Sequence, residues 1–358
     1  MQTLQSYSDY SSNSLRSFAK QKLSKVSHQS ILYKSSVFIW RIIQNVLLIY
    51  NYYYDYNRLI KWSSATSGFN TKSKLHASIT KNYHSIEKGL ALRQPKVGFG
   101  KDTIKRLVSN LEELQNKYGI DTIGQIALNT LSAYYQFNLE HGLVDEDLFQ
   151  KITKLKNYIH DSQNTTNQGG ILEISRKTIV EAAQMDLQAF FKSRHSIRQF
   201  DSEDVDMSLI EKAVTMAQKT PSVCNRQSCK VYVFSSYEDK IKVLSYQNGN
   251  RGFGDQANKI LVVVSDLENF TSIGERNQCW IDGGMYAMSL VYALHSLGLG
   301  TCCLNWSVEY KVDQALKQTT GIKDSESIIM MIAVGHIPEK LNVAQSARKK
   351  VDEVLVMK

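Results

Sequence analysis

A basic turn, Arg194-His195-Ser196-Ile197-Arg198-Gln199-Phe200, follows an apolar run that covers residues 185–191. The turn carries two arginines, a histidine and a hydroxyl group. Arginine forks make charge-assisted hydrogen bonds with phosphate oxygens, and these are strong hydrogen bonds. The stretch is therefore a candidate phosphate-binding segment, although a basic turn after a helix is also a common form of solvated surface. The residues that follow favour phosphate binding.

An amphipathic helix and a polar loop come next in the chain. Asp206 is placed to cap the start of the helix, and Pro221 ends it. The loop reads Thr-Pro-Ser-Val-Cys-Asn-Arg-Gln over residues 220–227. The apolar residues that recur at helical spacing are Leu209, Ile210, Ala213, Val214 and Ala217.

This order of turn, helix and loop resembles the nitroreductase-like superfamily of FMN oxidoreductases. In that family an R-[RH]-S-x-R-x-[FY] segment binds the flavin, and a P-S-x-x-N-x-Q-P-W loop from the other subunit closes the pocket. Further segments follow the family's order, so the resemblance extends from about residue 183 to the C-terminus. These segments cover residues 249–251, 255–265, 280–284, 297–301, 332–336 and 347–350.

The resemblance implies an α+β fold of three layers with a central, mostly antiparallel sheet, and a homodimer that binds FMN. The phosphate and pyrimidine end of the flavin would be bound by Arg194, His195, Ser196 and Arg198, with Arg348 as a further phosphate contact. The ring edge and the reactive edge would be lined by Asn250, Arg251 and the backbone of Leu304 and Asn305. The partner subunit would contribute Pro221, Ser222, Asn225 and Gln227.

The activity that the resemblance implies is reduction of the flavin by NADH or NADPH, followed by reduction of a small-molecule acceptor in a ping-pong cycle. The flavin supplies the chemistry, so no catalytic side chain is predicted. The chain departs from the family pattern at Ser228-Cys229, which replaces Pro-Trp, and at Ser346, where some members carry a second phosphate-binding lysine. The alternative function is a flavin-binding scaffold without activity, or a partner at a membrane surface in a biosynthetic pathway.

The composition limits the class of protein. With 358 residues, 42% of them hydrophobic, the chain is long enough for about two domains. The five cysteines form no C-x-x-C pair, so we predict no metal site and no disulfide framework, and a reducing, cytoplasmic compartment. Cys224 and Cys229 are interpreted as packed, reduced thiols. The formal charge of +9 comes without any nucleic-acid-binding motif, so we expect no nucleic-acid partner.

Three regions are predicted along the chain. Residues 1–30 are a loosely ordered basic segment, residues 31–183 a helical domain, and residues 184–358 the flavin-binding domain. The helical domain is expected to hold helices at 74–89, 103–118, 122–140 and 146–160, with Asp102 and Asp121 as N-caps. In its first helix His84, Glu87 and Lys88 share one face, as an ion-pair cluster or an anion site. In the C-terminal domain strands are expected at 230–234, 259–265 and 327–335, and helices at 277–297 and 308–319.

The most apolar run of the chain covers residues 37–54 and is too short and too amphipathic to span a membrane. It is expected to form a helix that packs on its own protein. The alternative is an interfacial helix, in which residues 31–60 contact an anionic membrane at the inner face. The basic surroundings fit that alternative, because residues 1–62 contain eight Lys or Arg and two Asp, a net charge of +6.

Overall fold

The computed structural model describes residues 31–159, 168–346 and 348–358. The predicted basic segment 1–30 and Ala347 lie outside the described residues. Two compact units are present, one ending at Asn57 and the other spanning Arg58–Lys358. The described part of the first unit belongs to one helix, α2 (Ile31–Trp62), whose last turn is part of the second unit. The domain boundary that was placed near residue 184 remains a prediction.

Hydrogen bonds to Asp324 fix the last turn of α2 within the second unit. Arg58 donates from Nε to the backbone oxygen of Asp324 over 2.8 Å, and the indole N–H of Trp62 donates to its carboxylate over 2.8 Å. The Lys61 ammonium lies 3.1 Å from the same carboxylate. The Arg58 side chain is almost completely buried, so these contacts hold the chain where the second unit begins.

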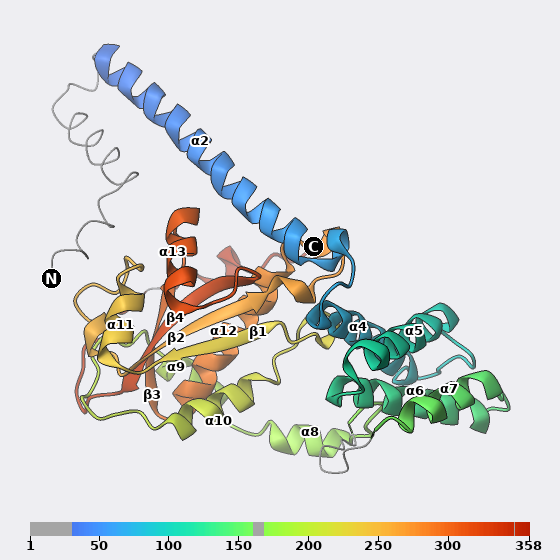
Figure 1. Cartoon of the computed structure of the whole chain (residues 1–358). Coiled ribbons are helices and arrows are strands. Elements are labelled where there is room, and N and C mark those ends of the chain that lie inside the picture. Colours follow the sequence, from blue (N-terminus) through green and yellow to red (C-terminus); the bar gives the residue numbers. More distant parts are fainter. Residues whose placement is uncertain (1–30, 160–167, 347) are drawn as a thin grey trace. The chain divides into compact units, whose positions relative to one another are not determined.

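Helices α4 to α7 form the helical region of the second unit (Figure 1). Their buried faces carry a continuous apolar core that includes Leu107, Leu111 and Leu128. Asp121 caps α6 as predicted, accepting the Gly124 N–H over 3.2 Å. The prediction for Asp102 was wrong: Gly100, in a left-handed conformation, is the N-cap, and Asp102 lies within the first turn of α5. The helices are α3 (Ser64–Ser67), α4 (Lys72–Leu90), α5 (Lys101–Tyr118), α6 (Thr122–Glu140) and α7 (Glu146–Lys156).

Four antiparallel strands form the central sheet in the order β1-β2-β4-β3. All residues of β2 are buried, because apolar layers cover both faces of this strand. Strand β3 was not predicted, since its first residues had been interpreted as the end of the preceding helix. The strands are β1 (Cys229–Phe234), β2 (Lys259–Asp266), β3 (Leu299–Asn305) and β4 (Glu326–His336).

Helices cover the sheet on both faces. Helices α10 (Met207–Ala217) and α12 (Gln278–Ser296) pack on the face that carries Leu261 and Val263 of β2. Helices α11 (Tyr237–Leu244) and α13 (Tyr310–Thr320) pack on the opposite face. The predicted three-layer α+β fold with an antiparallel sheet and a helical N-terminal region is therefore confirmed. The remaining elements are α8 (Arg176–Ala182), α9 (Leu187–Ser193) and the short 3₁₀ turns η2 (Val223–Asn225), η3 (Gly254–Gln256), η4 (Leu267–Asn269), η5 (Ile273–Glu275) and η6 (Val351–Glu353).

Gly283 allows α12 to approach the sheet closely. A Cβ atom at this position would lie 2.5 Å from the Ile329 side chain of β4, which is closer than packed atoms approach. At Gly284 a Cβ would meet nothing within 4 Å. Contact with the protein's own sheet is therefore sufficient to explain Gly283, whereas Gly284 is not required by packing within the chain.

Candidate functional site

The basic turn extends the sheet at its β3 edge. Ser196 forms a parallel bridge with Thr301, and the Ile197 N–H donates to the Thr301 backbone oxygen over 2.8 Å. Ile197 is buried against Gly300, where a Cβ atom would lie only 2.9 Å from its side chain. The alternation of inward Ile197 and outward Arg198 is that of a strand, and it fixes the turn on a rigid edge.

The cationic side chains of the turn gather along β3. The Arg198 guanidinium carbon lies 5.9 Å from the centre of the Phe253 ring, while Arg194 and His195 are half-buried. Burial and the charge of Arg194 lower the pKa of His295, whose Nε2 lies 2.8 Å from the Ser193 hydroxyl. Within the described parts of the chain, no carboxylate pairs with Arg194, His195 or Arg198. A positive cluster without a counter-ion on a fixed edge is suited to bind an anion.

The arginine charges of the turn affect the pKa values of the two β3 cysteines, Cys302 and Cys303. Burial raises the pKa of Cys302 and of Cys303, and the positive charges of Arg198 and Arg194, respectively, partly oppose the rise. Both thiols are therefore protonated near neutral pH, and neither is activated as a nucleophile.

Gln247 connects two of the predicted ring-edge segments. Its amide N–H donates to the Asn305 backbone oxygen over 3.1 Å at the end of β3. Its side-chain oxygen accepts the Gly249 N–H over 2.6 Å, and the Asn250 amide donates to the Leu244 backbone oxygen over 2.9 Å. Gln247 is buried and was missed by the sequence analysis, because nothing in the local pattern distinguishes this amide from others. The structure thus joins the Asn250 turn to the β3 end.

The three other predicted residues on this side of the sequence pattern are Arg251, Leu304 and Arg348. Arg251 is exposed beside Asn250, and Leu304 is buried in the core, so only its backbone is available to a ligand. Arg348 is exposed near the C-terminus and donates to the Ser346 backbone oxygen. Among the described residues, Arg348 forms no hydrogen bond or ion pair with the basic turn.

The loop of residues 220–227, which we call the Pro-Ser loop, has a strained backbone. Cys224, Asn225 and Gln227 have φ values of 49°, 52° and 49°, in the left-handed region that residues other than glycine rarely adopt. Each such residue costs about 1–3 kcal/mol, and such strain is concentrated at functional sites. The Ser222 hydroxyl accepts the Gln227 N–H over 2.9 Å, and the Asp282 carboxylate of α12 accepts the Val223 N–H over 3.1 Å. The loop is therefore held in one conformation, with Asn225 and Gln227 exposed.

Arg226 anchors this loop to the rest of the second unit. Its guanidinium is fully buried and forms a bidentate pair with Glu275 over 2.7 and 3.1 Å. Burial by itself would raise the pKa of Glu275, but the hydrogen bonds from Arg226 and the Thr271 amide lower it. The Thr271 hydroxyl accepts from Arg226 over 3.1 Å and from Lys81 of α4 over 2.9 Å. A chain of contacts thus runs from the helical region to the loop.

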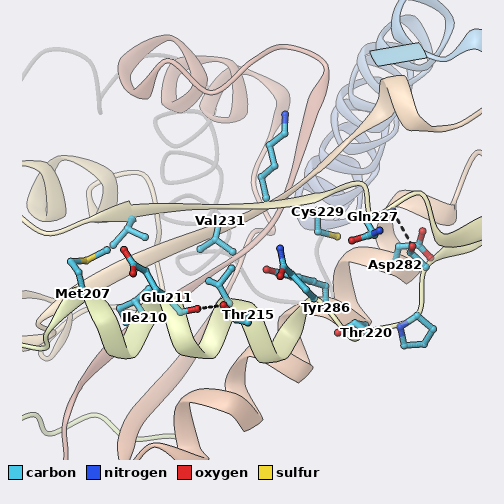
Figure 2. A pocket seen from close by; sticks show the side chains of 16 residues that line it. Met207, Ile210, Glu211, Thr215, Thr220, Gln227, Cys229, Val231, Asp282 and Tyr286 are labelled. Carbon is cyan, nitrogen blue, oxygen red and sulfur yellow. Dashed lines mark hydrogen bonds between the residues drawn. The ribbon is translucent and has the colours of Figure 1, made fainter. Parts of the chain in front are cut away.

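A pocket of about 510 Å³ lies beside the same loop, between α10, β1 and α12. Figure 2 shows Gln227, Cys229, Asp282 and Tyr286 at one end of the pocket and Met207 at the other. Burial raises the pKa of Cys229 to about 11 and that of Tyr286 to about 12. Both groups are therefore protonated near neutral pH. Cys224 and Cys229 are free thiols.

The basic turn and the Pro-Ser loop lie at different corners of the sheet within one chain. Strands β1 and β3 are opposite edges, separated by β2 and β4. Cys229 of β1 pairs with Ser265 of β2, which pairs with Ser327 of β4. Thr301 of β3 pairs with Val334, further along β4. At about 3.3 Å per residue and 4.8 Å per strand, Cys229 and Thr301 are roughly 27 Å apart. The structure therefore brings the turn, Asn250 and Asn305 to one side and leaves Pro221, Ser222, Asn225 and Gln227 at the other.

Part of the C-terminal region is similar to a known protein family. Residues 191–247 and 237–336 match the model of the nitroreductase family. An FMN-dependent nitroreductase from Clostridium difficile R20291 is 22% identical, covering 44% of this chain and 91% of that protein, with a TM-score of 0.38. A nitroreductase family protein from Streptococcus pneumoniae TIGR4 is 22% identical over 48% of this chain and all of its own (100%), with a TM-score of 0.42. A protein from Desulfovibrio desulfuricans, in complex with FMN, is 21% identical over 49% and 98%, with a TM-score of 0.42. No curated protein matches the chain significantly.

Proposed function

We propose that the protein is an FMN-dependent oxidoreductase whose flavin site is built on the β3 edge. The observation that carries this proposal is the basic turn, which holds two arginines and a histidine without a carboxylate partner on a rigid strand edge, within the region that matches the nitroreductase family. NADH or NADPH would be the electron donor, and a small molecule the acceptor, each using the same open face of the site in turn. When bound, FMN would supply the hydride-transfer chemistry.

The residues of the β3 edge would hold and orient the flavin. Arg194 and Arg198 would bind the phosphate as bidentate donors, with the Ser196 hydroxyl beside them. His195 would contact the pyrimidine end. The turn around Asn250, tied to Asn305 through Gln247, would form the wall at the ring edge. Hydrogen bonds already fix Asn250 in its own turn. Little conformational entropy of this side chain would therefore be lost when FMN binds.

We further propose a homodimer in which the Pro-Ser loop of one subunit closes the flavin site of the other. The separation of roughly 27 Å between loop and turn supports this arrangement, because one chain cannot bring them together. The exposed side of α12 supports it as well, since four large apolar side chains on this helix are 37–51% exposed. These side chains are Trp280, Ile281, Met285 and Met288.

The helical region would then serve to hold the loop. Helix α4 packs against η2 within the loop, and Lys81 of α4 donates to Thr271, the residue that also accepts from Arg226. A loop with three residues of positive φ needs such support to keep its conformation. This role does not require the helical region to bind a ligand.

The proposal is tested by purifying the protein, recording its visible spectrum and adding NADH or NADPH without oxygen. We expect an FMN spectrum that bleaches with one of the two nucleotides. Bound flavin that bleaches with neither would favour the alternative, a flavin-binding scaffold without activity, or another reductant. Absence of flavin even after reconstitution with FMN would contradict the proposed cofactor.

A further inference from the structure

Five apolar side chains of α2 line up as one stripe along the helix, whereas Trp40, Leu48 and Tyr52 are exposed on other sides of it. At 3.6 residues per turn, successive residues are about 100° apart, which brings five apolar residues from four turns within about 80° of one another. Gln44, Asn51 and Asp55 lie on the opposite side of the helix. We call the five residues the apolar stripe: Ile39, Ile42, Val46, Ile49 and Tyr53.

The apolar stripe is exposed along its whole length. The exposed fraction is lowest at Val46, with 45%, and highest at Ile49, with 67%. Soluble proteins rarely expose a continuous apolar surface unless it has a binding partner. The stripe spans residues 39–53, which corresponds to about 21 Å of helix. It is therefore a candidate contact surface.

The net charge of the N-terminal sequence indicates what kind of partner fits. Residues 1–62 carry a net charge of +6, from eight Lys or Arg and two Asp. A second copy would bring an equally positive segment of sequence alongside, and like charges would oppose the pairing. An anionic lipid surface offers both the apolar layer for the stripe and the negative charge for the basic residues.

The aromatic residues and the length of the apolar face favour a position in the membrane plane. Tyr50, Tyr52, Tyr53 and Tyr56 are all exposed near the end of the helix, and tyrosine prefers the headgroup region of a bilayer. Among the described helices, none combines the length and the hydrophobicity that crossing a membrane requires. The segment therefore fits a surface-lying helix better than a spanning one.

We propose that residues 31–60 bind the surface of an anionic membrane, with the apolar stripe of α2 buried at the boundary between headgroups and acyl chains. The net positive charge of residues 1–62 would attract the anionic headgroups. This interaction would place the oxidoreductase at a membrane surface. It rests on α2 and on the charge of residues 1–62, and it does not depend on the proposed flavin chemistry.

The test uses the full-length protein, with FMN if it binds FMN, and vesicle flotation. Vesicles contain phosphatidylcholine alone or equal parts of phosphatidylcholine and phosphatidylglycerol. Wild-type protein should bind the anionic vesicles at least about tenfold more tightly than the neutral ones, and salt should weaken this binding. The variant Ile42→Asp/Ile49→Asp should lose at least about tenfold in affinity, because it places charges in the stripe.

A matched control variant distinguishes the effect of the apolar stripe on vesicle binding from the effect of net charge. Gln44→Glu/Asn51→Asp adds the same two negative charges to the opposite side of α2, with side chains of nearly unchanged shape. It should keep its affinity for anionic vesicles within about threefold of wild type. Circular dichroism of each variant establishes that the fold is kept.

Three results would overturn the proposal. The first is that wild-type protein ignores anionic vesicles at low salt. The second is an equal loss of affinity in both variants, since charge alone would then explain binding. The third is a lower molar mass of the stripe variant in light scattering without lipid, which would assign the stripe to a second copy of the chain.

Discussion

Replacement of both Arg194 and Arg198 by alanine is expected to weaken FMN binding by at least about a hundredfold. A hydrogen bond to a charged group contributes about 1.5–3 kcal/mol, so two lost phosphate contacts correspond to about 3–6 kcal/mol. Since about 1.4 kcal/mol equals a factor of ten, the affinity should fall by roughly 10²–10⁴. The decrease is measured by titrating the apoprotein with FMN and following the quenching of flavin fluorescence.

The lysine variant and a surface variant provide controls for this result. Arg194→Lys/Arg198→Lys keeps the charge but loses the bidentate fork, so its affinity should lie between those of wild type and the alanine variant. Arg176→Ala/Lys177→Ala removes two exposed cations from α8 and should bind FMN as wild type does. If the double alanine variant at the turn binds FMN with wild-type affinity, the β3 edge is not the phosphate site.

Arg226→Ala is expected to lower the free energy of unfolding by about 3–5 kcal/mol, because it leaves the Glu275 carboxylate without its partner in a largely buried position. The guanidinium that is lost makes a bidentate ion pair and also bonds Thr271 and the Val223 backbone oxygen. The change is measured by urea denaturation of the protein without flavin. A loss of less than about 1 kcal/mol, the range of an exposed pair, would contradict the anchoring role.

The double variant Arg226→Met/Glu275→Gln is the matched control for this pair. It removes both charges while keeping side chains of similar size, and such replacements are often nearly neutral for stability. We therefore expect most of the lost free energy to be recovered. If the double variant is as unstable as Arg226→Ala, the loss comes from packing or from the Thr271 contact instead of the unpaired carboxylate.

The sequence predicted most of the fold because its apolar pattern is strong. Helix α6 was predicted with its observed limits, and β2 within one residue, since both are long runs with clear periodicity. Strand β3 was missed because Gly298 and Gly300 resemble a helix end followed by a turn. The structure explains the second glycine differently: Gly300 gives room to Ile197 of the basic turn, a contact that only the tertiary structure reveals.

The candidate site was predictable where a motif marks it and not where packing makes it. The basic turn and the Pro-Ser loop were recognised from residue order, and the structure places the turn on an edge strand. Gln247 and the role of Arg226 were missed, because their partners Asn305 and Glu275 lie 58 and 49 residues away in the chain. Nothing in the local sequence indicates such long-range pairs.

The central claim is that the flavin site combines the basic turn of one subunit with the Pro-Ser loop of another. The direct test is a mixed dimer of two defective chains. One chain carries Arg194→Ala/Arg198→Ala, and the other, with a different affinity tag, carries Asn225→Ala/Gln227→Ala. In the mixed dimer one site receives both defects, while the other combines an intact turn with an intact loop.

The measurement is the flavin content and the bleaching by NADH or NADPH of the doubly purified mixed dimer, compared with each parent dimer. The account predicts about one reducible flavin per mixed dimer, and strongly reduced flavin binding or bleaching in both parents. A mixed dimer as defective as its parents, or a monomer that binds and reduces flavin like the wild-type protein, would contradict it.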